Sequence, residues 1–170
     1  MTFPHVWKLG DNVDTDMIIP GRFLANWNSQ PEKLKECCLI DVLPDFSQNV
    51  AKGDILVAGR NFGCGSSREA APMSIKMAGI SVILAESFAR IFYRNCLNIG
   101  LMAITLPNAT RDISSGDHIE VMLEQGIVKN LSTGRELPFS PFPEQVLELI
   151  RLGSLQAYVL QRIRNKKTSS

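Results

Sequence analysis

Apolar residues in the middle of the chain fall into two alternating patterns. Three buried strands are predicted at residues 54–58, 81–85 and 101–105, because each of these ranges contains an uninterrupted run of four apolar residues. Between them, residues 69–77 and 87–97 show helical spacing. Gly79 ends the first of these helices, and Ser87 is expected to cap the second, which ends near Gly100. Uninterrupted apolar strands that alternate with helices predict an α/β fold with a mainly parallel sheet covered on both faces.

The two ends of the chain show different patterns. Near the N-terminus we expect a strand at residues 6–9 and a polar turn at 14–16, followed by a short apolar run at 17–19. A loop at residues 22–30 then leads to a helix at 31–38. Near the C-terminus we expect a hairpin with strands at residues 117–123 and 127–131, followed by a turn at 132–134. Two helices are expected at residues 143–152 and 154–163, separated by Gly153. No internal repeat or long linker divides the chain, so a single domain over residues 1–170 is expected.

Composition narrows the classes of function. Apolar residues occupy 45% of the 170 positions and charged residues 21%, as in folded soluble proteins, and the formal net charge of +1 gives no reason to expect a nucleic-acid or membrane partner. No apolar run approaches the length of a membrane span, and the first residues lack the features of a signal peptide. We therefore expect a cytoplasmic protein.

The cysteines and histidines argue against a metal centre within this chain. The four cysteines form no C-x-x-C pair, and the two histidines, His5 and His118, lie far apart in the sequence. We expect reduced thiols that mostly serve in packing. Cys64 lies in a glycine-rich turn, where a thiolate near a helix start would be reactive, but the need for a small side chain is the favoured interpretation.

The strongest candidate for chemistry is this glycine turn, residues 59–69, which read Gly-Arg-Asn-Phe-Gly-Cys-Gly-Ser-Ser-Arg-Glu between a predicted strand and a predicted helix. Its glycines permit positive φ and close approach of a ligand, and the helix start offers free N–H groups to an anion. One alternative is that Ser66 or Ser67 only caps the helix. The adjacent Arg68 and the preceding glycines favour a carboxylate site instead. The spacing matches neither a dinucleotide fingerprint, a P-loop nor a nucleophile elbow.

Three segments together resemble one known family. They are residues 12–20, 59–69 and 87–95. Their sequences and order are similar to those of 3-isopropylmalate dehydratase small subunits, a family that also includes homoaconitase small subunits and the C-terminal swivelling domain of aconitase. The resemblance implies a swivelling β/β/α fold with a mainly parallel central sheet. It also implies a subunit of a hydro-lyase that isomerises 2-isopropylmalate and 3-isopropylmalate in leucine biosynthesis.

The same resemblance implies a division of roles between two proteins. In the family, a large subunit holds a [4Fe–4S] cluster on three cysteines, and one iron binds the hydroxyl and a carboxylate of the substrate. This chain, without cluster-spaced cysteines, is expected to hold no cluster. At the matching positions the resemblance makes Ser66 the catalytic base, Arg68 the residue that binds a substrate carboxylate, and Ser67 an assisting substrate-binding residue. A helix start and a guanidinium are suited to stabilise the alkoxide that such a base requires.

The segment Phe23-Leu24-Ala25-Asn26 is expected, again by resemblance, to contact the variable side group of the substrate. In related enzymes an arginine at its third position accompanies the extra carboxylate of homoaconitate, whereas apolar residues accompany isopropylmalate. Ala25 favours isopropylmalate, although Arg22 precedes the segment and Asn26 is polar. The alternatives are the small subunit of a homoaconitase or of a dimethylmalate- or methylmalate-type dehydratase and, in another class, an anion-binding module without a partner.

Two further groups of polar residues have open roles. Asp14, Thr15 and Asp16 either position the loop at residues 22–30 through side-chain caps, which we favour, or contribute polar groups to the site. Arg90 and Arg94 lie four residues apart on one face of a predicted helix. Anion binding and contact with a neighbouring acidic loop are equally supported for these two arginines.

Overall fold

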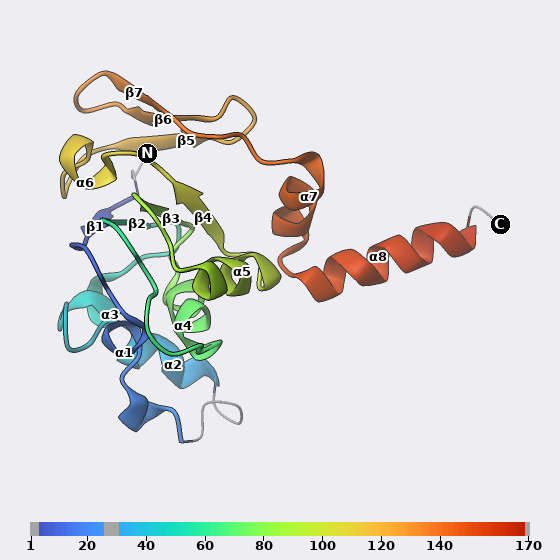
Figure 1. The fold of residues 1–170 in the computed structure, drawn as a ribbon, viewed down its shortest axis with the longest axis horizontal. Coiled ribbons are helices and arrows are strands. Elements are labelled where there is room, and N and C mark those ends of the chain that lie inside the picture. Colours follow the sequence, from blue (N-terminus) through green and yellow to red (C-terminus); the bar gives the residue numbers. More distant parts are fainter. Residues whose placement is uncertain (1–3, 26–30, 169–170) are drawn as a thin grey trace.

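The computed structural model describes residues 4–25 and 31–168, which form three layers around a central parallel sheet (Figure 1). The sheet has the strand order β1-β2-β3-β4, and every neighbouring pair is parallel, as predicted. Its strands are β1 (Val6–Lys8), β2 (Ile55–Ala58), β3 (Val82–Ala85) and β4 (Met102–Thr105). Every residue of β2 and β3 is buried, which explains why their sequences are uninterrupted apolar runs.

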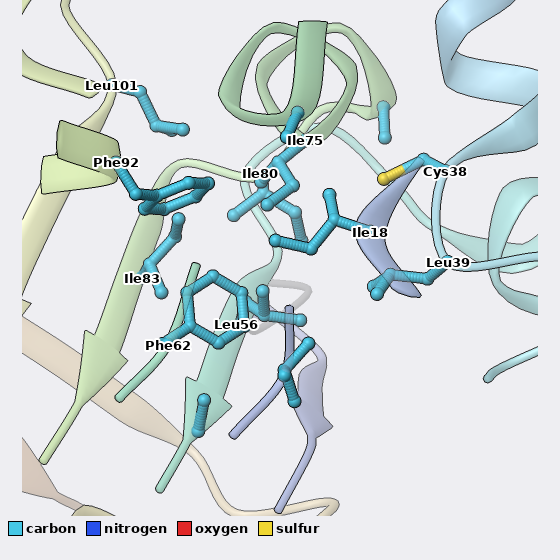
Figure 2. Packing of buried hydrophobic residues seen from close by; sticks show 14 of the residues in the cluster. Ile18, Cys38, Leu39, Leu56, Phe62, Ile75, Ile80, Ile83, Phe92 and Leu101 are labelled. Atoms are coloured by element: carbon cyan, nitrogen blue, oxygen red, sulfur yellow. The ribbon is translucent and has the colours of Figure 1, made fainter. Parts of the chain in front are cut away.

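Helices from the first hundred residues cover one face of this sheet (Figure 1). They are α1 (Thr15–Ile18), α2 (Leu34–Cys37), α3 (Phe46–Asn49), α4 (Ala70–Ala78) and α5 (Arg90–Asn98). Their apolar side chains pack with Leu56 and Ile83 from the sheet (Figure 2). In the same cluster the rings of Phe62 and Phe92 lie edge to face, with centroids 5.3 Å apart. This contact holds the segment after β2 against α5.

A second, antiparallel sheet covers the opposite face. It consists of β5 (Ile119–Met122), β6 (Ile127–Asn130) and β7 (Arg135–Pro138), and the short helix α6 (Ala109–Asp112) also contacts β2 and β3. The buried cluster between the two sheets includes Val57 and Leu84 from the central sheet and Val128 and Leu137 from the outer one. The order of layers, sheet on sheet on helices, is the β/β/α arrangement that the resemblance implied.

Most predicted elements exist, and the differences have local causes. The predicted hairpin is confirmed as β5 and β6, but the sequence does not predict the edge strand β7, in which Arg135, Glu136 and Pro138 are exposed. The helix predicted over residues 31–38 is instead a 3₁₀ turn, η2 (Pro31–Lys33), followed by α2. The sequence also does not predict α1, α3 or α6, because four residues are too few to show a helical period.

Ser87 does not cap α5, contrary to the expectation. The helix begins at Arg90 after Ala89, and Ser87 Oγ instead accepts a hydrogen bond from Asn61 N at 2.8 Å. The chain before the helix also pairs with the glycine turn, since Phe62 N donates to Ser87 O at 3.0 Å and Ala89 N donates to Phe62 O at 2.9 Å. The residues predicted as the first turn of this helix therefore position the candidate site.

The two C-terminal helices, α7 (Glu144–Leu152) and α8 (Leu155–Thr168), are separated by Gly153, as predicted. α7 packs beside α5, whereas α8 projects away from the rest of the molecule (Figure 1). At the junction, Lys76 Nζ donates hydrogen bonds to Ile99 O and, at 2.8 Å, to Gly153 O. Burial lowers the pKa of Lys76. One side chain from α4 thus links the C-terminal ends of α5 and α7.

Candidate functional site

The glycine turn lies at the carboxyl end of β2, and backbone hydrogen bonds hold it on two sides. Gly63 N donates to Val13 O at 2.8 Å, and Thr15 N donates to Cys64 O at 2.9 Å. On its other side the turn pairs with residues 87–89 through the hydrogen bonds of Phe62. Two segments that are distant in the sequence therefore fix the backbone of the turn.

The conformation of the turn requires glycine at two positions. Gly63 has a φ of +78°, and a Cβ atom there would lie 2.1 Å from Cγ of Phe92. Gly65 has a φ of +89°, and its Cβ position lies 3.4 Å from Thr15 Oγ1. Residues with side chains rarely adopt this left-handed region. The two glycines therefore let the turn run close to both α5 and α1.

Ser66 and Ser67 follow these glycines and are exposed. Thr15 Oγ1 donates a hydrogen bond to Ser66 O at 3.0 Å, which fixes the backbone of Ser66 and leaves its hydroxyl free. Within residues 4–25 and 31–168, neither serine hydroxyl has a hydrogen-bond partner. α4 begins only at Ala70, and the residue before it, Glu69, makes no side-chain cap. The alternative that either serine is only a helix cap is therefore wrong.

Arg68 is paired with a carboxylate of this chain. Its Nη1 and Nη2 donate to the two carboxylate oxygens of Asp16 at 2.6 and 3.0 Å, and Nη1 also donates to Ile19 O at 3.3 Å. The Arg68 side chain is 21% exposed and the Asp16 side chain 57%, so the guanidinium is the more buried partner. This is the two-pronged geometry that arginine also offers to a ligand carboxylate. Asp16 thus fixes the orientation of Arg68 next to the serines.

The polar segment 14–16 has a positioning role, as we favoured, but it positions α1 and the glycine turn rather than the loop at residues 22–30. Asp14 Oδ1 accepts a hydrogen bond from Met17 N at 2.7 Å and so caps α1. Thr15 holds the backbone of Ser66, and Asp16 holds the side chain of Arg68. The segment therefore builds α1 and attaches it to the glycine turn.

A cavity of about 300 Å³ lies between the glycine turn and the first turn of α5. All three predicted residues of the turn, Ser66, Ser67 and Arg68, line this cavity. The residues that line it from the opposite side belong to α5 or its N-cap: Ala89, Arg90, Ile91, Phe92 and Asn95. The sequence leaves the role of Arg90 open and does not single out the others. The signal that could have identified these residues is their place in the segment 87–95, which carries part of the resemblance but suggests no chemistry by its residue types alone.

Arg90 and Arg94 differ in their surroundings. Both are exposed, and neither forms a hydrogen bond or ion pair with another described residue. Arg90 lines the cavity, whereas Arg94, one turn further along α5, does not. Contact with an acidic loop therefore finds no support in the described part of the chain.

The segment expected to contact the substrate's side group lies apart from this cavity. Phe23 ends the 3₁₀ turn η1 (Gly21–Phe23), Leu24 packs against the core on the helical side, and Ala25 is exposed. None of these three residues lines the cavity. Asn26 lies outside the described residues. The structure therefore does not bring this segment together with the serines, and its role in substrate choice stays a prediction.

Arg22, just before that segment, is already paired. It donates two hydrogen bonds to Asp41 at 2.8 and 2.5 Å, and its guanidinium carbon lies 4.6 Å from the centroid of the Phe23 ring. Its neighbour Gly21 approaches the cavity more closely, because a Cβ atom there would lie 3.8 Å from Nη1 of Arg68. The chain just before the segment therefore lies beside the Arg68–Asp16 pair, while Arg22 binds a different carboxylate.

The described residues contain no group of three His, Cys, Asp or Glu side chains that could hold a metal ion. Burial raises the pKa of Cys38 to about 12 and also raises the pKa of Cys96, so both thiols stay protonated near neutral pH. Cys37 and Cys64 are partly exposed. In the part of the chain that the structure covers, no helix is both long and apolar enough to cross a membrane.

Known proteins resemble this chain in both sequence and fold. Residues 30–109 match the aconitase C-terminal domain. The chain is 48% identical over 163 residues to the 3-isopropylmalate dehydratase small subunit of Aquifex aeolicus, which covers 95% of this chain and 96% of that protein. It is also 48% identical over 159 residues to the isopropylmalate/citramalate isomerase small subunit of Methanocaldococcus jannaschii, with 94% of each chain covered. A crystal structure of 3-isopropylmalate dehydratase from Methanocaldococcus jannaschii matches 98% of both chains with a TM-score of 0.90 and 36% identity. The chain belongs to the family of 3-isopropylmalate dehydratase small subunits.

Proposed function

We propose that this chain is the small subunit of a 3-isopropylmalate dehydratase, a hydro-lyase that interconverts 2-isopropylmalate and 3-isopropylmalate by removing and re-adding water in leucine biosynthesis. The names of the relatives suggest the reaction. One observation carries it to this chain, namely that Ser66, Ser67 and Arg68 line one cavity, with both hydroxyls unpaired among the described residues. The cavity volume of about 300 Å³ suits one small diacid.

The other half of the site belongs, in this proposal, to a large subunit that holds a [4Fe–4S] cluster. The described part of this chain does not fit a cluster, because Cys38 and Cys96 are buried with protonated thiols and no group of three ligands is present. When bound, the cluster supplies a Lewis acid that eases the departure of hydroxide. Ser66 and Arg90 are exposed at the cavity, which suits a site that a second protein completes.

Each residue of the turn has a chemical part in this proposal. Ser66 Oγ accepts the carbon-bound proton during dehydration and returns it during the reverse addition. A serine alkoxide is accessible only where hydrogen-bond donors stabilise it, and the guanidinium N–H groups of Arg68 together with the N–H groups in the first turn of α5 are the donors proposed for this role. Arg68 binds one substrate carboxylate through the N–H groups that Asp16 and Ile19 leave free, and Ser67 donates a hydrogen bond to the same carboxylate.

A second substrate is favoured by one specific finding. The relative named for both isopropylmalate and citramalate is as similar to this chain, at 48% identity, as the relative named for isopropylmalate alone. Citramalate carries a methyl group in place of the isopropyl group, so the same carboxylate and proton chemistry would serve both substrates. In the proposal, Phe23, Leu24, Ala25 and Asn26 contact this variable group and set the preference.

The test is an anaerobic assay of the chain co-expressed with its large subunit, on 2-isopropylmalate, citramalate, homoaconitate and dimethylmalate. We expect turnover of 2-isopropylmalate, and we expect Ser66→Ala to lower kcat by about a hundredfold or more. Ser115→Ala, at an exposed serine that does not line the cavity, is the matched control and should leave kcat unchanged. Turnover of homoaconitate but of none of the other three compounds would indicate that the chain is the small subunit of a homoaconitase. No turnover by a heteromer that holds its cluster would favour the anion-binding module.

A further inference from the structure

The charge of the cavity depends on one residue. Only two charged side chains line it, Arg68 and Arg90, both within the described part of the chain. Asp16 neutralises Arg68 through two hydrogen bonds that occupy both of its carboxylate oxygens. Arg90 has no ion-pair or hydrogen-bond partner among the described residues. Arg90 therefore supplies the net positive charge of the cavity.

A diacid needs more positive charge than the Arg68–Asp16 pair provides. A dianion beside a neutral ion pair loses hydration without an equal return, whereas a free guanidinium binds a carboxylate through two parallel hydrogen bonds. Arg90 is also the first residue of α5, and Ala89 before it makes no side-chain cap, so the first N–H groups of the helix add to the same positive field.

Resting on the proposed function, we propose that Arg90 binds the second carboxylate of the malate-type substrate. Arg68 and Arg90 then hold the two carboxylates from opposite walls of the cavity, and Ser66 lies on the wall of Arg68. This assigns to α5 a substrate-binding role that the glycine turn alone does not supply. It also explains why two arginines on one helix face differ, since Arg94 lies outside the cavity.

The test compares Arg90→Gln, Arg90→Lys and the matched control Arg94→Gln in the co-expressed heteromer. Arg90→Gln should raise the KM for 3-isopropylmalate about tenfold or more, as expected for a lost charge-assisted contact, with a smaller effect on kcat. Arg90→Lys should recover part of the affinity, because it restores the charge but not the planar fork. Arg94→Gln should leave both constants unchanged.

A second measurement isolates the carboxylates from the rest of the substrate. Succinate, a diacid without the hydroxyl or the side group, should inhibit the wild type competitively. Its inhibition constant should rise in Arg90→Gln by a factor similar to that of KM, and acetate, a monoacid, should not discriminate between the variants. Equal KM values and equal succinate constants in Arg90→Gln and Arg94→Gln would overturn the proposal. Failure of the large subunit to co-purify with Arg90→Gln would overturn it as well, by placing Arg90 at the subunit contact.

The two proposals can fail separately. If the wild-type heteromer turns over none of the malates, the proposed function fails. Succinate binding by the full chain alone then still decides the role of Arg90, because a ligand that binds the folded state raises the melting temperature. A rise in the melting temperature of the wild type with succinate that is absent in Arg90→Gln supports the carboxylate contact. An equal response of both proteins rejects it.

Discussion

Arg68 illustrates how much of the candidate site depends on the partner of a single side chain. Its contacts with Asp16 and Ile19 leave the guanidinium in one orientation, beside Ser66. Ion pairs with an exposed partner typically contribute only about 0–1 kcal/mol to the free energy of unfolding. The contribution of this pair is therefore geometric: it holds the guanidinium in one orientation at the cavity, where the proposed function has it bind a substrate carboxylate.

Arg68→Lys should lower kcat and raise the KM for 3-isopropylmalate in the heteromer. Lysine keeps the positive charge but cannot contact both oxygens of Asp16 and a substrate carboxylate through one planar fork. Steady-state kinetics measure the effect, and Arg111→Lys is the control, because Arg111 pairs with Asp112 and does not line the cavity. An unchanged kcat/KM for Arg68→Lys would show that the guanidinium serves the fold alone.

Three of the four thiols, Cys38, Cys64 and Cys96, should differ in their reaction with an alkylating reagent at pH 8. We expect Cys64, which is partly exposed, to react in the folded protein, and Cys38 and Cys96 to remain unmodified. With the pKa of Cys38 raised to about 12, its reactive thiolate is only about one part in ten thousand at this pH. Peptide mass spectrometry before and after unfolding measures the difference. Equal rates for Cys38 and Cys64 in the folded protein would contradict the packing described here.

At the residue scale, the sequence predicts what is contiguous and misses what folding brings together. Ser66, Ser67 and Arg68 stand side by side in a motif, so their candidate chemistry can be read directly. The partner of Arg68, Asp16, lies 52 positions away, and only the packing of α1 against the glycine turn joins them. Arg90 is similar, because its place in the cavity depends on where α5 begins.

At the scale of elements, the glycine turn behaves as a rigid part of the fold. Gly63→Ala should lower the free energy of unfolding by about 3 kcal/mol or more, because the new methyl group would both occupy a left-handed backbone position and overlap the ring of Phe92. Gly116→Ala is the matched control. Gly116 has a φ of +86° but no atom within 4 Å of its Cβ position, so its cost should be only about 1 kcal/mol.

Denaturant unfolding of the two glycine variants gives both values. Similar losses in the two variants would mean that Phe92 moves aside and that the close approach of the turn to α5 is not tightly constrained. A larger loss in Gly63→Ala would show that the wall of the cavity is rigid. The contact with Phe92 would then be what sets the separation between the serines and α5.

The segment after η1 should set the choice of substrate in the heteromer. Ala25→Arg should shift the ratio of kcat/KM from isopropylmalate towards homoaconitate, because a cation there would compensate the extra carboxylate, whose uncompensated burial costs several kcal/mol at worst. Arg22 does not already fill this role, since Asp41 binds both of its terminal nitrogens. If the ratio of kcat/KM does not change in Ala25→Arg, or if the wild type already prefers homoaconitate, then this segment does not determine the choice of substrate.

The elements that the sequence predicts well are those whose pattern is long or fully buried. The strands β2 and β3 and the helices α4, α7 and α8 belong to this group. The elements that it misses are short, such as α3 and α6, or exposed at an edge, such as β7. Ser87 is a different case, because its residue type suits a helix cap, yet its hydroxyl accepts a hydrogen bond from Asn61 N in the glycine turn.

At the scale of the whole molecule, the proposed function makes this chain one wall of a site that a second protein completes. The isolated chain should therefore be colourless, bind no iron–sulfur cluster and show no dehydratase activity. Absorption spectra and iron analysis of the anaerobically purified chain measure this, with the co-expressed heteromer as the positive control. A brown preparation of this polypeptide alone would contradict the proposed division between the two subunits.

Because α8 joins α7 at Gly153, a change in the angle between the two helices would move the far end of α8. Fourteen residues of α helix extend about 21 Å, so a rotation of about 10° at Gly153 displaces the far end by about 4 Å. Lys76 links α5 to this junction, because its ammonium group donates hydrogen bonds to the carbonyl oxygens of both Ile99 and Gly153. If a change in the packing of α4 against α5 moved Lys76, we would expect the angle between α7 and α8 to change with it. A pair of spectroscopic labels on the tip and on the central sheet would convert such motions into a measurable distance.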